Sequence, residues 1–318
     1  MQYRELGSTG ITISAIVMGT WQAGKAMWAG IDDRETSTAV RAAFDEGITT
    51  FDTAEEYGRG HSERILGPAL KDVRDRVVLA SKVFPTNLEP AALVEACHRS
   101  LQNLSTDYMD LYQIHWPAGS WKTKTVPIED SMEALMRLRE QGKIRAIGVS
   151  NFSTEKLEKA LKCGPVASVQ PPYSLFWRQA DRDLIPFCRE RGITVLAYSP
   201  LAQGIITGRF GSEHRFAKGD HRVRNRLFSP ENRENVERAL SLFLPMAEEL
   251  KVSPAKLALA WVLHQKGVCP VVGARNEAQI RDNAGAADLV LSDRNLEELE
   301  RISAIATGGL DDDPVQWR

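Results

Sequence analysis

The stretch Gly-Ile-Thr-Thr-Phe-Asp-Thr-Ala-Glu-Glu-Tyr-Gly at residues 47–58 joins an apolar strand pattern to a polar turn. Residues 47–51 are rich in β-branched side chains and follow a helix-ending glycine, which predicts a short buried strand. Asp52 ends that strand, and Tyr57 lies in the loop after it. Two interpretations are open: an acid and a phenol delivered to one site, or an Asp that only caps the turn and a Tyr that only packs.

Two further strand patterns also end on basic side chains. Residues 77–82 run apolar and stop at Lys82, and residues 109–115 do the same and stop at His115. A lone Lys or His at such a position is usually a solvated or satisfied polar group. In a (β/α)8 barrel, however, the carboxyl ends of successive strands converge on the face that carries catalytic groups. We therefore expect Asp52, Tyr57, Lys82 and His115 to meet.

Strand and helix patterns alternate along the whole chain. Regular alternation of this kind predicts a parallel sheet with helices outside it. The predicted fold is an α/β (β/α)8 TIM barrel, formed as a single domain over residues 1–318, with an N-terminal β-hairpin at residues 3–14 that plugs the bottom of the barrel. The predicted strands begin at Ala15, Thr49, Val77, Tyr108, Ala146, Ser168, Thr194 and Val268.

One segment interrupts the alternation. Residues 201–232, after the seventh barrel strand, are predicted to form a long loop, which in a compact domain is usually a functional lid or partly disordered. Its basic run at residues 221–226 is expected to be a solvated surface. The tail at residues 308–313 is flexible in composition.

Composition excludes several classes of partner. With 40 Lys and Arg against 42 Asp and Glu, the net charge of -2 gives no reason to expect nucleic acid or a membrane surface. The four cysteines, Cys97, Cys163, Cys188 and Cys269, are scattered without a C-x-x-C pair, which predicts reduced thiols, no metal site and a cytoplasmic location. No run of residues approaches the length of a membrane span. The oligomeric state stays open.

The motif around Tyr57 is specific. The sequence Phe51-Asp52-Thr53-Ala54 with Tyr57-Gly58, followed by Gly60, Ser62, Glu63 and Leu66-Gly67, resembles the aldo-keto reductase family, as does the stretch at residues 142–152. The resemblance runs over nearly the whole chain. It implies reduction of aldehydes and ketones to alcohols by hydride transfer from NADPH.

The four clustered side chains suit that chemistry. Reducing a carbonyl requires a proton for the developing alkoxide, and Tyr57 is the expected general acid. We expect the Lys82 ammonium to lower the pKa of Tyr57 toward working pH, and Asp52 to hold Lys82 protonated and in place. His115 offers a donor or acceptor toward the substrate oxygen. These roles match those known for the family.

No G-x-G-x-x-G opens a helix after the first strand, so a Rossmann dinucleotide site is not expected. The resemblance instead places the cofactor site in the second half of the barrel. By resemblance, Ser150, Asn151 and Gln170 hold the nicotinamide carboxamide and Tyr198 stacks on its ring. Arg275 is expected to grip a 2′-phosphate and so to favour NADPH over NADH; alternatively it only pairs with a surface acid. The other predicted cofactor residues are Gly19, Thr20, Trp21, Asp52, Ser199, Pro200, Leu201, Gln203, Gly204, Gly273, Gln279 and Asn283.

Five aromatic residues lie just beyond predicted strand ends, where they are expected to wall a pocket for a small carbonyl with an apolar portion. They are Trp21, Trp28, Phe84, Trp116 and Trp177. The substrate itself is not defined by the sequence. Two other functions are open: an NADP(H)-binding redox sensor or regulatory subunit, similar to potassium channel β-subunits, with incidental turnover, and a Schiff-base aldolase that uses Lys82.

Overall fold

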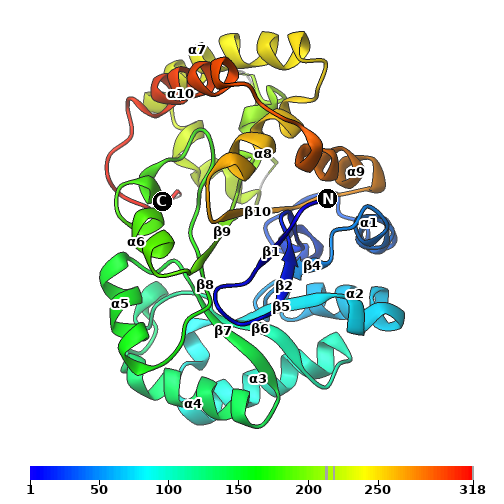
Figure 1. The fold of residues 1–318 in the computed structure, drawn as a ribbon, viewed down its shortest axis with the longest axis vertical. Coiled ribbons are helices and arrows are strands. Elements are labelled where there is room, and N and C mark those ends of the chain that lie inside the picture. Colours follow the sequence, from blue (N-terminus) through cyan, green and yellow to red (C-terminus); the bar gives the residue numbers. More distant parts are fainter. Residues whose placement is uncertain (212–213, 218, 317–318) are drawn as a thin grey trace.

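The computed structural model describes residues 1–211, 214–217 and 219–316. Within them, eight parallel strands close into a barrel in the order β10-β3-β4-β5-β6-β7-β8-β9, which confirms the predicted (β/α)8 fold (Figure 1). Residues of all eight strands are almost entirely buried. The strands are β3 (Val17–Gly19), β4 (Thr50–Asp52), β5 (Val78–Val83), β6 (Met109–Ile114), β7 (Ile144–Ser150), β8 (Ser168–Gln170), β9 (Thr194–Tyr198) and β10 (Val268–Val272).

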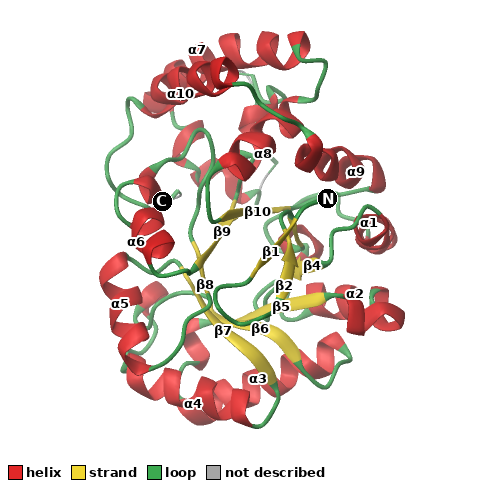
Figure 2. Cartoon of the chain, viewed as in Figure 1, coloured by secondary structure: helices red, strands yellow, loops and turns green. Residues whose placement is uncertain are grey.

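Helices surround the barrel and separate its strands from solvent (Figure 2). Several begin at a side-chain cap, as when Asp32 accepts a hydrogen bond from the amide of Glu35 and Ser153 accepts one from the amide of Lys156. A large apolar core fills the space between strands and helices. The helices between the strands are α1 (Asp33–Asp45), α2 (His61–Ala69), α3 (Pro90–Leu104), α4 (Ile128–Glu140), α5 (Thr154–Cys163), α6 (Leu184–Glu190) and α8 (Pro254–His264), and α9 (Glu277–Ala284) follows β10.

The N-terminal hairpin closes one end of the barrel, as predicted. Strands β1 (Tyr3–Glu5) and β2 (Thr12–Ser14) pair antiparallel, and in Figure 1 they lie across the middle of the ring. Leu6, Ile11 and Ile13 pack in one cluster with inward residues of the barrel strands. Gly7 makes the turn at φ 57°, and a Cβ there would lie 2.7 Å from the carbonyl oxygen of Ala167.

The long loop that the sequence predicts after β9 is present, and short turns order much of it. Short 3₁₀ helices η6 (Ala202–Thr207), η7 (His221–Arg224) and η8 (Arg226–Phe228) fold it onto the barrel, and α7 (Pro230–Glu249) then begins. Residues 212, 213 and 218 of the predicted loop lie outside the described residues. The basic run is solvated only in part: Arg224 is exposed, whereas Arg226 is only 6% exposed and Arg222 lies among aromatic rings.

The C-terminal segment after α10 (Asp293–Thr307) packs against that region, although its composition is typical of a flexible tail. Arg226 donates to the carboxylate of Asp311 at 2.5 Å and to the carbonyl of Asp313 at 3.3 Å. Its guanidinium also lies 5.3 Å from the ring of Trp177, whose Nε1 donates to the carbonyl of Pro314. The tail is fixed by contacts with residues far away in the sequence.

Candidate active site

A single cavity of about 1020 Å³ opens at the carboxyl ends of the barrel strands. It gathers most of the residues that the sequence predicts for the site, drawn from many strand ends. These are Gly19, Trp21, Trp28, Asp52, Tyr57, Phe84, His115, Trp116, Ser150, Asn151, Gln170, Tyr198, Ser199, Pro200, Leu201, Gln203, Gly204, Gly273, Arg275, Gln279 and Asn283.

Lys82 lies behind Tyr57 and is fully buried. Val78 and Ala80 of β5 pack inside the barrel, so the alternation of side chains along the strand also turns Lys82 inward. Its Nζ donates to Asp52 Oδ1 at 2.5 Å, to the carbonyl of Thr53 at 2.9 Å and to Tyr57 Oη at 3.3 Å. The ammonium is therefore held against the phenol, in the arrangement that the sequence predicts.

The second carboxylate oxygen of Asp52, Oδ2, also accepts hydrogen bonds. Gln113 Nε2 and Gln170 Nε2 donate to Asp52 Oδ2 at 3.1 and 3.0 Å. Together with Lys82 these residues form what we call the Asp52 cluster (Asp52, Lys82, Gln113 and Gln170). Sequence reasoning missed Gln113, although its position two residues after the inward Leu111 of β6 is a usable signal.

Burial and charge act against each other in this cluster. Burial acts to lower the pKa of Lys82, but Asp52 and Tyr57 outweigh it, so the pKa is raised and the group is an ammonium. For Tyr57, burial raises the pKa, Lys82 lowers it and Asp52 raises it again, and the net shift is upward. The expected net lowering by Lys82 is therefore wrong, because desolvation of the phenolate is the larger effect. The phenol stays protonated at neutral pH.

His115 faces the phenol from the end of β6. Its ring centroid lies 5.6 Å from that of Tyr57 and 5.8 Å from that of Phe84. Burial, and then the charge of Lys82, lower the pKa of His115 well below its usual value, so the imidazole is neutral at neutral pH. Asn151 Nδ2 donates to the backbone carbonyl of His115 at 3.0 Å and ties this strand end to the next.

Polar groups line the neighbouring part of the cavity. Ser150 Oγ donates to the carbonyl of Gln170 at 2.8 Å, and Tyr198 Oη donates to Asn151 Oδ1 at 2.8 Å. Asn151 adopts a left-handed backbone at φ 61°, which turns its amide toward these partners. These hydrogen bonds fix the amide and hydroxyl groups before any ligand binds.

The far end of the cavity is cationic. Gln279 Oε1 accepts a hydrogen bond from the backbone amide of Arg275 at 2.8 Å, so the first turn of α9 fixes the loop that carries this arginine. Burial and the charge of Arg222 lower the pKa of the Arg275 guanidinium. No carboxylate within the described part of the chain forms an ion pair with Arg275, and a surface ion pair is not its role there.

Two loops meet over the cavity through contacts that the sequence did not reveal. The ring of His221 lies 4.4 Å from Trp21 and 4.6 Å from Trp28, and His221 Nδ1 donates to the carbonyl of Met27 at 3.1 Å. Arg222 pairs with Asp220 and lies 5.3 Å from the Trp28 ring. We call these residues the loop clasp (Trp21, Met27, Trp28, His221 and Arg222).

Two predicted site residues lie elsewhere. Trp177 was predicted to line the pocket, but it is fully buried behind the barrel under Arg226, because the chain after β8 turns outward before reaching it. Thr20 is buried beside the cavity and does not line it; its hydroxyl donates to the carbonyl of Asp52 and accepts from Ser62. Both are supporting residues of the fold.

The described residues offer neither a metal site nor a membrane-spanning helix. Throughout residues 1–211, 214–217 and 219–316, no three His, Cys, Asp or Glu side chains gather in a way that could hold a metal ion. In the same residues, every helix is too short or too polar to cross a membrane.

Comparison with known proteins identifies the family. Residues 15–304 match the family described as "Aldo/keto reductase family". The aldo-keto reductase YhdN of Bacillus subtilis is 36% identical over 95% of this chain and 93% of its own, and the NADH-specific methylglyoxal reductase of Escherichia coli is 34% identical over 91% and 94%. A Klebsiella pneumoniae aldo-keto reductase, solved in complex with NADPH, superposes with a TM-score of 0.77 at 32% identity over 100% of this chain and 99% of its own. The chain belongs to the aldo/keto reductase family and is an NAD(P)-dependent oxidoreductase.

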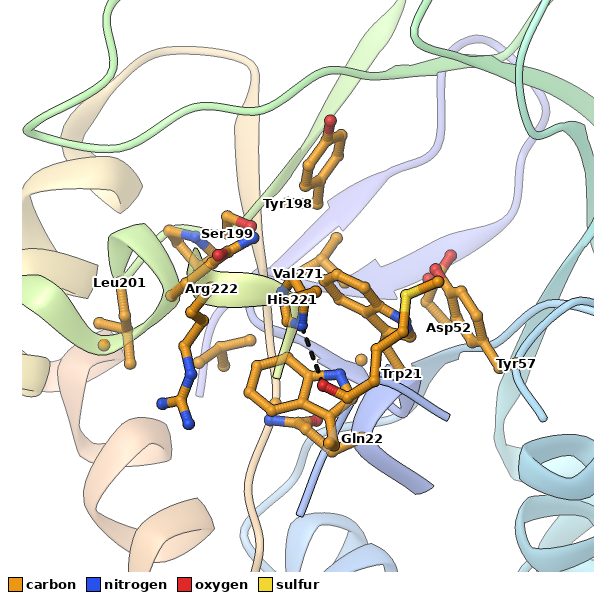
Figure 3. A pocket seen from close by; sticks show the side chains of 18 of the residues that line it. Trp21, Gln22, Asp52, Tyr57, Tyr198, Ser199, Leu201, His221, Arg222 and Val271 are labelled. Carbon is orange, nitrogen blue, oxygen red and sulfur yellow. Dashed lines mark hydrogen bonds between the residues drawn. The ribbon is translucent and has the colours of Figure 1, made fainter. Parts of the chain in front are cut away.

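The donor set of the cavity fits a nicotinamide dinucleotide. Amide and hydroxyl groups lie at one end, and the partly buried Arg275, which forms no ion pair among the described residues, lies at the other end of the same cavity. In Figure 3, Ser199, Leu201 and Arg222 lie on one side, Tyr57 and Asp52 lie on the other, and Trp21 and His221 stand between them. A long ligand with an anionic end and a neutral amide end matches this distribution.

Proposed function

We propose that this chain, as one barrel domain over residues 1–318, reduces aldehydes and ketones to alcohols with NADPH, and that Tyr57 is the general acid. The observation that carries the proposal is the contact of Lys82 Nζ with both Tyr57 Oη at 3.3 Å and Asp52 Oδ1 at 2.5 Å, on the wall of a cavity that fits the cofactor. The family membership supports the reaction class.

Each residue of the site has a definite part in this reaction. The reduced nicotinamide, when bound, supplies the hydride. Tyr57 Oη donates its proton to the carbonyl oxygen as negative charge develops there, and the Lys82 ammonium stabilises the phenolate that remains. Asp52 keeps that ammonium in place. Neutral His115 helps to orient the substrate oxygen, and the aromatic walls exclude water from it.

The proposal includes the cofactor-binding residues. Ser150, Asn151 and Gln170 hold the carboxamide and Tyr198 stacks on the nicotinamide. The loop at residues 199–204 lines the pyrophosphate through Ser199, Pro200, Leu201, Gln203 and Gly204. Arg275, with Gln279 and Asn283, binds the adenosine phosphate and favours NADPH. A relative is NADH-specific and a structural neighbour is complexed with NADPH, so the preference depends on local residues. The free thiols favour a cytoplasmic location.

The aldolase alternative is disfavoured by the state of Lys82. A Schiff base requires a neutral amine that a carbonyl can reach. Lys82 is an ammonium with a raised pKa, is fully buried, and donates to three oxygens, those of Asp52, Thr53 and Tyr57. Borohydride should therefore trap no covalent adduct on this side chain.

The direct test is a panel of aldehydes and ketones, each incubated with NADPH or NADH while the loss of reduced nucleotide is followed by absorbance. We expect carbonyl-dependent oxidation of NADPH with formation of the alcohol. Tight NADPH binding without turnover on any carbonyl would instead support the redox-sensor alternative. Formation of a borohydride-trapped adduct would support the aldolase.

A further inference from the structure

The charged side chains of the cavity are segregated. Arg222 and Arg275 lie 5.3 and 6.0 Å from the same ring, that of Trp28. Figure 3 shows Arg222 on the side of Ser199 and Leu201, across Trp21 and His221 from Tyr57. The cations therefore gather at the end of the cavity that is remote from the general acid.

The end near Tyr57 carries a carboxylate instead. Glu56 precedes Tyr57 in the chain and lines the cavity. No hydrogen bond or ion pair of its side chain exists among the described residues, whereas the adjacent Glu55 accepts from the backbone amide of Phe84 at 2.8 Å and from Asn87 at 2.9 Å. Glu56 is exposed, yet partial removal of water around its carboxylate, and then the charge of Glu55, raise its pKa, with Arg59 only partly offsetting them. Glu56 is thus an acid with no partner of its own at the substrate end.

Aromatic side chains on the loop after β6 also line the cavity. Trp116 and Trp121 both line it and meet edge to face with centroids 5.3 Å apart. Trp121 is 55% exposed and has a left-handed backbone at φ 58°, although it is a bulky residue. An exposed aromatic side chain held in an unfavourable backbone conformation at a cavity mouth points to a ligand-contacting role.

A cavity lined by both a carboxylate and aromatic rings has the composition that recognises organic cations. The faces of Trp and Tyr carry negative potential and attract ammonium groups, and an unpaired carboxylate adds charge complementarity. An anionic group in the same place would meet the Glu56 charge and the negative ring faces at short range.

Building on the proposed function, we propose that the mouth formed by Glu56, Trp116 and Trp121 is a substrate-selecting site that favours carbonyl compounds bearing a cationic organic group and rejects those bearing a carboxylate. The carbonyl lies at Tyr57, and the charged group of the substrate lies toward Glu56 and the two tryptophans. The selection acts on the substituent remote from the reacting carbon, so it changes which carbonyl compounds are used without changing the reaction.

The test uses three benzaldehydes with different para substituents: trimethylammonio, tert-butyl and carboxylate. The first two have nearly the same shape and differ in charge. Because intrinsic reactivities differ, the quantity to compare is the ratio of kcat/KM between wild type and variant for each aldehyde. Glu56→Gln should lower kcat/KM for the cationic aldehyde about threefold to tenfold, raise it by a similar factor for the carboxylate and change it less than about twofold for the tert-butyl compound.

Two controls isolate the site. Glu95→Gln removes the same charge from an exposed position on α3 outside the cavity and should leave all three ratios unchanged, which separates local from global electrostatics. Trp121→Leu keeps an apolar side chain but removes the ring, and should reduce use of the cationic aldehyde more than that of its tert-butyl analogue. Equal responses of all three aldehydes to Glu56→Gln would overturn the inference while leaving the reductase function intact.

A binding measurement keeps the inference testable without turnover. The corresponding para-substituted benzyl alcohols are titrated calorimetrically into the protein saturated with NADPH, a complex that cannot react. Wild type should bind the trimethylammonio alcohol more tightly than the carboxylate alcohol, and Glu56→Gln should reduce that difference about threefold or more. Failure of every aldehyde to react would remove the proposed function, whereas loss of this binding preference would remove only the substrate selection.

Discussion

The Asp52 cluster and the loop clasp border the same cavity but are built in opposite ways. The cluster consists of strand residues that are at most 2% exposed and hydrogen-bonded to one another. The clasp joins loops through ring contacts and through hydrogen bonds from the His221 side chain and backbone amide to the carbonyl of Met27, and Met27 is 58% exposed. Rigid strands therefore hold the polar groups behind Tyr57, whereas separable loops border the path by which ligands enter.

This difference matters because the two tasks have different tolerances. A proton donor has to be fixed within a fraction of an ångström of its acceptor, and Tyr57, on the loop after β4, is held by its contact with Lys82 of the packed strand β5. A long cofactor has to enter and leave, and loops held by modest contacts can open and close. Substitutions in the cluster should affect the chemical step and stability, and substitutions in the clasp should affect binding.

The largest expected effect comes from Tyr57→Phe, which removes the proposed proton donor, the hydroxyl that contacts Lys82 of the Asp52 cluster. Turnover should fall about 10²- to 10⁴-fold, because general acid catalysis contributes that much, while NADPH binding stays within about twofold. Single-turnover kinetics and fluorescence titration measure the two quantities. Tyr3→Phe, which alters an exposed hydroxyl bonded to Gly47, is the matched control. A Tyr57→Phe enzyme that keeps a third of wild-type turnover is incompatible with our assignment.

Lys82→Met tests the cluster as a unit. It leaves Asp52 buried without its cation, which should lower the free energy of unfolding by about 3 to 5 kcal/mol. It also removes the charge that lowers the pKa of Tyr57, so the alkaline limb of residual activity should move to higher pH. Urea unfolding and a pH–rate profile measure these changes. If the two profiles coincide, Lys82 and Tyr57 are not coupled.

Arg275→Ala tests the cationic end. Charge-assisted hydrogen bonds are worth roughly 1.5 to 3 kcal/mol, so NADPH affinity should fall about ten- to a hundredfold while NADH affinity changes by only a few fold. Turnover at saturating cofactor should be preserved. Arg294→Ala removes an exposed arginine outside the cavity and serves as the control in titrations with both nucleotides. Equal losses for the two nucleotides would mean that Arg275 only supports the groove.

The stability of the protein should depend on pH, because burial lowers the pKa of both His115, which faces Tyr57, and His221 of the loop clasp. As the pH falls below about 6.5, the unfolded chain binds protons that the native protein does not, so stability decreases on acidification, by up to about 1.4 kcal/mol per pH unit for each histidine. Urea unfolding between about pH 7.5 and 5.5 should show this slope, and His115→Asn should reduce it. A wild-type slope of zero would contradict the prediction.

The smallest effect is expected from His221→Ala, which removes the ring between Trp21 and Trp28. Aromatic contacts of this kind contribute about 0.5 to 1.5 kcal/mol, so NADPH should dissociate roughly two- to tenfold faster, with the chemical step unchanged. Stopped-flow displacement of the bound nucleotide measures this rate. If the dissociation rate were unchanged and the chemical step were slower, the loop clasp would serve the chemical step and not cofactor binding, which contradicts our assignment.

Some features of the site follow from local sequence patterns. The strand ends at Asp52, Lys82 and His115 were predictable because each follows an apolar run, and the barrel places such ends on one face. The alternation of side chains along β6 could have predicted that Gln113 also points into the barrel. Arg222 and His221 were not predictable, since a basic run in a polar segment looks the same whether it faces water or packs on tryptophans.

The sequence alone therefore determined the barrel, the hairpin that closes it and the convergence of the four reactive groups, because strand and helix periodicities and strand-end positions are local properties of the chain. Only the tertiary structure decided the folding of the segment after β9, the burial of Trp177 under the C-terminal tail and the upward shift in the pKa of Tyr57. Each of these depends on contacts between residues far apart in the chain or on how much water their packing removes. A linear pattern does not encode either quantity.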